Sequence, residues 1–188
     1  ACQEDFFKIF AMDCPFTEKE FEGMERKKLR EKTYEVVMES FKNRCERFTS
    51  MAFPVIKNAY EQNGGMYDYI MVPITDGRRI YQIRVSLKEA YETEGKNILL
   101  AFEKILLLHT IDEAWKENLR ELDELKHSVQ NASYEQKDPL VIFKLESGTL
   151  FNAMISDIND NTISVLMRCS LPVMEPQEVK EAPLPEHE

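Results

Sequence analysis

The residues that could do acid–base or metal chemistry are present, but their spacing does not suit it. His109 and His127 are 18 residues apart on one predicted helix, about 27 Å along its axis, so they cannot share a metal ion. The acidic residues of this helix alternate with lysines and arginines, and Arg120 with Glu124 is an opposite-sign i,i+4 pair. A solvated, ion-paired helix face is therefore expected, rather than a general acid and base.

The cysteines and glycines also form no recognisable site. Four cysteines (Cys2, Cys14, Cys45 and Cys169) lie far apart, with no C-x-x-C pair, which argues against zinc and favours reduced cytosolic thiols. The six glycines form no phosphate-binding loop, and no serine-hydrolase or zinc-protease motif is present. We therefore predict no catalytic residue, no metal site and no bound cofactor for these residues.

Composition narrows the class of protein further. The chain has 188 residues, of which 43% are hydrophobic and 31% charged, as in soluble globular proteins. Its net charge of −10 argues against general nucleic-acid binding. No apolar run approaches the roughly 18 residues that a membrane span needs. The sequence begins at Ala1 inside a charged helical pattern, and we expect a piece of a longer protein.

Two long amphipathic helices are predicted in the C-terminal half. The first runs from Lys96 to about Asn131, about 54 Å, with one apolar stripe: Ile111, Trp115, Leu119, Leu122, Leu125 and Val129. Asp138 followed by Pro139 predicts the start of the second helix, which runs to about Arg168. Its weakest part is the polar segment 159–161. The short connection makes the two helices antiparallel neighbours.

The N-terminal half is predicted to combine helix with a β-hairpin. Thr17 and Glu20 have capping-box spacing and should start a charged helix that Pro54 ends or kinks. Residues 67–86 alternate like strands around Asp76-Gly77, which indicates a type I′ turn, and Pro73 should lie at a sheet edge. A two-stranded ribbon should pack on the helices. Residues 172–188 carry a net charge of −4 and are predicted to be a disordered acidic tail.

Several motifs in the two long helices occur together in one family. They are Phe102-Glu103-Lys104, His109 to Leu119 (HTIDEAWKENL), Tyr134 to Pro139 (YEQKDP) and Phe143 to Ser147 (FKLES) with Phe151. In this order and spacing the chain resembles the SecA family, the ATP-driven motors of bacterial preprotein secretion. A weaker match to the helical wing of the family covers Leu29 to Arg44.

The resemblance implies an architecture that is mainly α. Residues 1–95 would be the helical wing with an inserted β-hairpin at about 67–86, and 96–171 the helical scaffold with its two-helix finger. At the finger tip, Tyr134 would contact the translocating chain and the SecY channel, together with Ser133, Glu135, Gln136 and Lys137. An aromatic ring suits such sequence-tolerant contact, although Tyr134 could instead pack its own loop.

The family also implies roles outside the finger. Trp115 and Leu119 would pack between domains, against the remaining SecA domains. ATP and magnesium would bind only to parts of the parent that are missing here. The location would be cytoplasmic, peripherally associated with the inner membrane. Departures are the tip sequence 131–133, where many relatives have a basic residue and glycine, and the β-hairpin. The alternative interpretation is a free-standing helical adaptor module that binds a partner protein.

Overall fold

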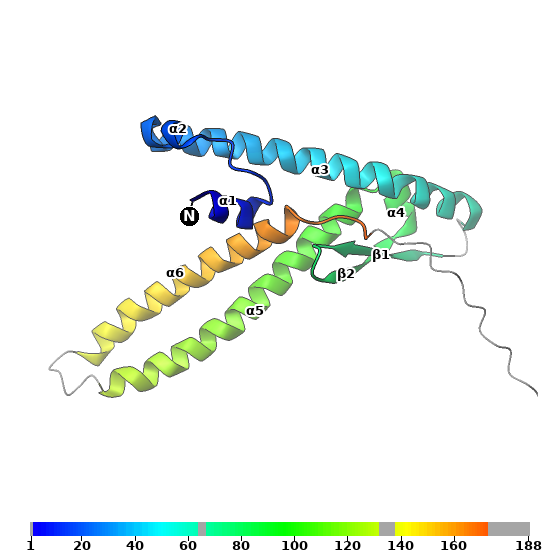
Figure 1. The fold of residues 1–188 in the computed structure, drawn as a ribbon. Helices are drawn as coiled ribbons and strands as arrows, with labels where there is room; N and C mark the ends of the chain where they lie inside the picture. The colour runs from blue at the N-terminus through cyan, green and yellow to red at the C-terminus, as the bar shows by residue number, and fades with distance from the viewer. Residues whose placement is uncertain (1, 64–66, 132–137, 173–188) are drawn as a thin grey trace, which may run out of the picture.

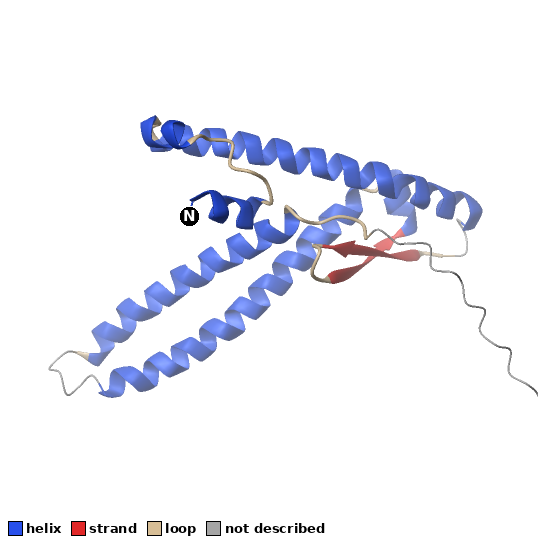
Figure 2. Ribbon diagram, viewed as in Figure 1, coloured by secondary structure: helices blue, strands red, loops and turns tan. Residues whose placement is uncertain are grey.

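The structure is a computed structural model that describes residues 2–63, 67–131 and 138–172. It is mainly α-helical with one two-stranded sheet, which confirms the predicted fold class (Figure 2). The elements follow in the order α1 (Cys2–Phe10), α2 (Glu18–Gly23), α3 (Arg26–Asn63), β1 (Tyr69–Thr75), β2 (Ile80–Ser86), α4 (Leu87–Glu92), α5 (Lys96–Asn131) and α6 (Pro139–Leu166).

The helices α5 and α6 form a long antiparallel hairpin that extends from a compact base (Figure 1). At the base, α3 crosses over the start of α5. The sheet lies beside α5, and α4 connects β2 to α5. The short helix α1 packs on the last part of α6. The hairpin therefore projects from one end of a mixed helix and sheet core.

The predicted capping box is present, but the helix that it starts is short. The Glu20 carboxylate accepts the Thr17 amide at 3.0 Å, and the Thr17 hydroxyl accepts the Glu20 amide at 3.4 Å. This helix, α2, ends at Gly23, and Met24 is extended with ψ of 136°. The prediction of one helix from Thr17 to Pro54 is thus wrong, because glycine has low helix propensity and the chain turns there.

Pro54 does not end α3. The helix continues for nine more residues, to Asn63, although proline lacks the amide of the helical ladder and crowds the preceding turn. Phe48, Ala52 and Ile56 lie on both sides of Pro54 and are all buried in the core. Tertiary packing of this face therefore holds the helix together across the proline.

The β-hairpin has the alternation predicted for it, with a different turn. Ile83 and Val85 point into the core, while Ile80, Gln82 and Arg84 are exposed. The paired strands end at Thr75 and Ile80, which leaves four residues in the connection. Gly77 has φ of +85°, and the Asp76 carboxylate accepts the amides of Arg78 and Arg79 at 2.8 and 2.7 Å. The predicted type I′ turn is wrong, since its first central residue would also need a positive φ.

Pro73 lies on an edge of the sheet, as predicted. Both strands of a two-stranded sheet are edge strands, so the missing amide of proline breaks no central ladder. Thr75, two residues further along β1, exchanges two backbone hydrogen bonds of 2.9 Å with Ser170, just after α6. The chain that leaves the hairpin is thereby tied to the sheet.

The core lies at the base and joins α3, the sheet, α4 and α5. Its buried side chains are Phe48, Ala52, Ile56, Val72, Ile74, Ile83, Val85, Leu87, Ala90, Ile98, Leu99, Phe102, Leu106 and Cys169. The ribbon thus packs on helices as expected. The domain limits of 1–95, 96–171 and 172–188 stay predictions, and this core contains residues from both sides of the first limit.

Candidate functional site: the α5–α6 hairpin

The start of α5 is set by a glycine turn after α4. Gly95 has φ of +84°, which favours glycine, and its amide donates to the Ala90 carbonyl at 2.8 Å. A Cβ at this position would be 3.4 Å from a methyl group of Ile56. This turn therefore aims α5 away from α3 while keeping the first turns of α5 in the core.

The start of α6 follows the predicted chemistry. The Asp138 carboxylate accepts the Leu140 amide at 2.9 Å, and Pro139 occupies the first helical turn. The helix then runs without interruption through 159–161 to Leu166. Packing against α5 thus outweighs the low helix propensity of that polar segment.

The seam between α5 and α6 contains a buried polar side chain. Asn118 is 2% exposed, and Val129, Met154 and Ile158 of the same seam are also buried. Within the described residues, the Asn118 amide nitrogen has no hydrogen-bond partner. A buried amide without a partner costs free energy, so the seam is less stable than an all-apolar one.

A strip of apolar side chains on α5 is exposed. The exposed strip consists of Ile105, Leu108, Ile111, Trp115 and Leu119, with exposed fractions of 44%, 67%, 40%, 47% and 49%. Scattered exposed apolar residues are ordinary, but a contiguous apolar surface indicates an interaction site. The strip is therefore the candidate functional surface of the described hairpin.

The predicted single stripe of α5 is divided in the structure. Val129 is buried and Leu122 and Leu125 are half-buried, whereas Ile111, Trp115 and Leu119 are exposed. Ile111 and Val129 are 18 residues apart, which is five full helical turns, so they lie on the same side of α5 although only Val129 is buried. The difference in exposure therefore follows position along the helix and not rotation around it.

The sequence predictions for the tip fall outside the described residues. Ser133, Tyr134, Glu135, Gln136 and Lys137 all lie in 132–137, so their contact roles stay predictions. The end of α5 and the start of α6 lie at the end of the hairpin far from the core (Figure 1). Trp115 and Leu119, predicted to pack between domains, are half-exposed on the strip.

The charged residues of α5 form ion pairs on the solvated face. Lys116 Nζ lies 2.6 Å from Asp112 and 3.3 Å from Glu113, and these hydrogen bonds raise the pKa of Lys116. Arg120 pairs with Glu117 instead of the predicted Glu124. Nowhere in the described ranges do three or more His, Cys, Asp or Glu side chains converge as metal ligands.

Of the two thiols near the base, Cys169 is buried and Cys45 is half-buried. Burial, reinforced by the neighbouring Cys45, raises the pKa of Cys169 to about 11, and burial followed by the charge of Glu103 raises the pKa of Cys45. Burial also raises the pKa of Glu103. Nucleophilic cysteines have lowered pKa values, so these thiols are structural.

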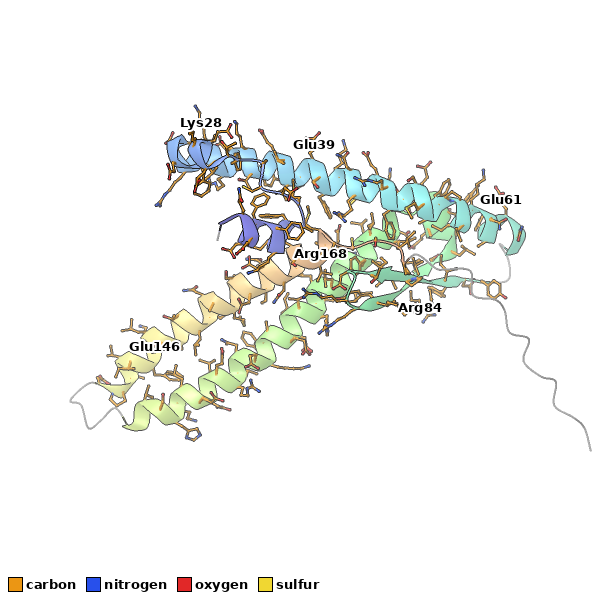
Figure 3. The ribbon with its side chains drawn as sticks, viewed as in Figure 1. Lys28, Glu39, Glu61, Arg84, Glu146 and Arg168 are labelled. Atoms are coloured by element: carbon orange, nitrogen blue, oxygen red, sulfur yellow. The ribbon has the colours of Figure 1, made fainter. Side chains whose placement is uncertain are left out.

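Arg168, two residues after the end of α6, ties α1 to the base of the hairpin (Figure 3). Its guanidinium donates to the backbone carbonyls of Phe7, at 3.1 Å, and of Lys8. The Ser164 hydroxyl also donates to the Lys8 carbonyl, at 3.2 Å. Sequence reasoning missed this contact because the partners are about 160 residues apart; the only hint was a basic residue at a helix end.

No helix in the described part of the chain combines the length and apolar character needed to cross a bilayer. No solved structure shows significant similarity to the chain.

Comparison with known sequences assigns the chain to a family. Residues 3–170 match the family model described as the SecA Wing and Scaffold domain. Proteins named "Protein translocase subunit SecA" are 62% identical over 178 residues in Phocaeicola vulgatus and 60% identical over 174 residues in Bacteroides thetaiotaomicron. A relative with the same name in Porphyromonas gingivalis is 45% identical over 173 residues.

These matches cover 95%, 93% and 92% of this chain and 16% of each relative, so the chain spans about a sixth of their length. The long hairpin on a mixed base and the match over residues 3–170 lead to one conclusion: the chain belongs to the SecA wing and scaffold domain family.

Proposed function

We propose that this chain is the scaffold and two-helix finger of a protein-translocating ATPase, and that it couples movements of the motor to passage of a preprotein through the SecY channel. The observation that carries this proposal is the projecting α5–α6 hairpin with its exposed strip. A rigid antiparallel pair of helices can transmit a displacement from its base to its far end. The relatives are named as translocase subunits.

The tip would be the part that meets other chains. Tyr134 would touch the translocating polypeptide, with Ser133, Glu135, Gln136 and Lys137 around it, because a large amphipathic ring contacts many sequences equally well. The exposed strip would pack against the remaining domains of the motor. Trp115, with 47% of its surface exposed, has the size and polar edge of an interface anchor.

The chain itself would do no chemistry. Its described residues form ion pairs and structural thiols instead of an acid–base pair or a nucleophile. ATP and magnesium would be bound by other parts of a full-length translocase, which would work in the cytoplasm at the inner membrane. The finger would contribute to translocation through its position at the channel and its rigidity.

The test is photo-crosslinking in a full-length translocase that contains this segment. A photoreactive phenylalanine analogue replaces Tyr134 in one variant and Trp115 in another. The proposal predicts crosslinks from position 134 to a stalled preprotein and to SecY, and crosslinks from 115 only within the translocase. Crosslinks to preprotein from 115 but not from 134 would contradict the finger assignment.

A further inference from the structure

An apolar groove lies between the N-terminal half of α3, α1 and the end of α6. Its volume is about 640 Å³. The apolar side chains that line it include Leu29, Val37 and Phe41 on α3 and Phe10, Leu166 and Met167 on the opposite wall. Cavities of this size hold a ligand or several apolar side chains of a partner.

The α3 wall of the groove is one continuous helix face. Its lining residues recur at threes and fours from Arg26 to Phe41, a length of about 22 Å. Tyr34 is 66% exposed and Met38 is 44% exposed. The C-terminal half of the same helix buries its apolar face in the core. Half of α3 is therefore packed, and half presents an apolar face to the groove.

The start of α3 carries a cluster of cations next to acidic residues. Residues 26–32 contain Arg26, Lys27, Lys28, Arg30 and Lys32 against a single acid, Glu31, and residues 18–25 contain four glutamates and one lysine. Positive charge at a helix N-terminus opposes the helix dipole. Across the described residues, none of these five cations lies within 4.0 Å of a carboxylate. Arg26 and Arg30, the two of these cations that line the groove, can therefore pair with carboxylates of a partner.

We propose that the groove binds an amphipathic helix supplied from outside these 188 residues. The apolar face of that helix would fill the space between Val37 and Met167, and its carboxylates would meet Arg26 and Arg30, which line the groove themselves. This binding site is separate from the tip and from the exposed strip, and it does not depend on their proposed roles.

The shape and the chemistry of the groove favour a helix over other occupants. The walls are helices whose backbone groups are already paired, so an extended segment would leave its own amides and carbonyls unpaired in apolar surroundings. A helix satisfies its own backbone and presents apolar side chains at the matching spacing. A membrane surface would have to enter a concave groove, which a flat lipid layer does not fill.

The test uses the 188-residue chain and a fluorescein-labelled helical peptide of about 16 residues, with leucines at i, i+3, i+4 and i+7 and glutamates at one end. Fluorescence anisotropy should show saturable binding. Arg26→Glu combined with Arg30→Glu should weaken binding at least about tenfold, because it replaces attraction by repulsion at the rim. Val37→Asp should weaken binding as strongly by placing a charge in the apolar groove.

The control variant has the same change in net charge as the double arginine variant, but at residues far from the groove. Lys57→Glu combined with Lys88→Glu should change peptide affinity by less than about twofold, since both lysines lie on exposed surfaces at the other end of α3 and on α4. Thermal melts verify that each variant is folded, and a folded variant is required for each comparison.

Several results would overturn the proposal. These are no peptide binding by the wild-type chain, equal weakening by the control pair, or binding that Val37→Asp leaves unchanged. Binding to phosphatidylglycerol vesicles that requires Arg26 and Arg30, without peptide binding, would assign the rim to anionic lipid. A concentration-dependent dimer in sedimentation that Val37→Asp dissociates would assign the groove to a second copy.

Discussion

The base of the molecule and the shaft of its hairpin use the same helix in different ways. Near the start of α5, Phe102 is fully buried between the sheet and α3, and Tyr81 packs edge-on against its ring at a centroid distance of 5.4 Å. About four turns further along, Trp115 retains 47% of its exposure. Both side chains are large and apolar, so the difference in their exposed fractions comes from the elements that surround them.

The base and the shaft also differ in the number of elements whose contacts stabilise them. The base brings together residues from α3, both strands, α4, α5 and the segment after α6. Among the described residues, the shaft is held mainly by contacts between α5 and α6, through a seam that contains a buried amide at Asn118. We infer that the base carries most of the stability, while the shaft leaves an apolar surface exposed.

The largest expected effect is the difference in stability loss between a buried and an exposed aromatic residue of α5. Phe102→Ala should lower the free energy of unfolding by about 3–5 kcal/mol, because it leaves a cavity in the core. Trp115→Ala should cost less than about 1 kcal/mol, because half of the indole is already in water. Urea unfolding followed by circular dichroism measures both. Equal losses would break the distinction between base and shaft.

The second prediction concerns the joint between α1 and the hairpin. Arg168→Met removes the hydrogen bonds to the Phe7 and Lys8 carbonyls and should cost about 2 kcal/mol. Hydrogen exchange should accelerate in α1 and stay unchanged in α5. Lys42→Met, at an exposed ion pair, is the control and should leave α1 protected. Unchanged protection of α1 in Arg168→Met would show that other contacts hold it.

The third prediction tests the seam and has the opposite sign. Asn118→Leu should stabilise the hairpin by about 1 kcal/mol, because it replaces a buried unpaired amide by an apolar side chain of similar size. The melting temperature should rise by about 2–4 °C. Asn118→Ala is the comparison variant and should not stabilise, because it leaves a cavity. A fall in melting temperature for Asn118→Leu would mean that the amide is well paired.

The smallest expected effect concerns the turn of the β-hairpin and depends on pH. Burial raises the pKa of Asp76, but hydrogen bonds from the Arg79 and Arg78 amides outweigh it, and the net pKa is lowered. A lowered folded pKa stabilises the fold above the unfolded value of about 3.9, and this contribution is lost as the pH falls through the folded value.

Asp76→Asn should therefore destabilise the chain by about 0.5–1 kcal/mol at pH 7. The difference from wild type should shrink below pH ~4. Urea unfolding at several pH values measures this difference. Asp123→Asn, on the exposed side of α5, should show no such trend. A difference that grows on acidification would contradict the assigned hydrogen bonds.

Helix caps and helix starts were predictable from the sequence, whereas features that depend on tertiary packing were not. The capping box at Thr17 and the start of α6 at Asp138 depend on a few neighbouring residues, and both were predicted correctly. The break at Gly23 was missed although glycine has low helix propensity. The continuation of α3 beyond Pro54 depends on tertiary packing of its buried face, which propensity does not describe. The four-residue turn depends on the Asp76 carboxylate, which pairs with amides beyond a two-residue turn.

The candidate site shows the same division. Trp115 and Leu119 were identified from spacing and resemblance, but their exposure depends on how closely α6 packs at their level along α5. Neither the groove nor the Arg168 contact could be foreseen, because each joins the first residues of the chain to the last helix. The predicted tip, 133–137, awaits the crosslinking experiment.

The central claim is that the exposed strip is a surface for other molecules, and the chain offers a direct probe because Trp115 is its only tryptophan. Iodide quenching of its fluorescence should be about half as efficient in the folded chain as in the urea-unfolded chain, in line with its 47% exposure. In a full-length translocase with its other tryptophans replaced, quenching should nearly disappear. Full protection in the isolated chain, or unchanged quenching in the full-length protein, would contradict the claim.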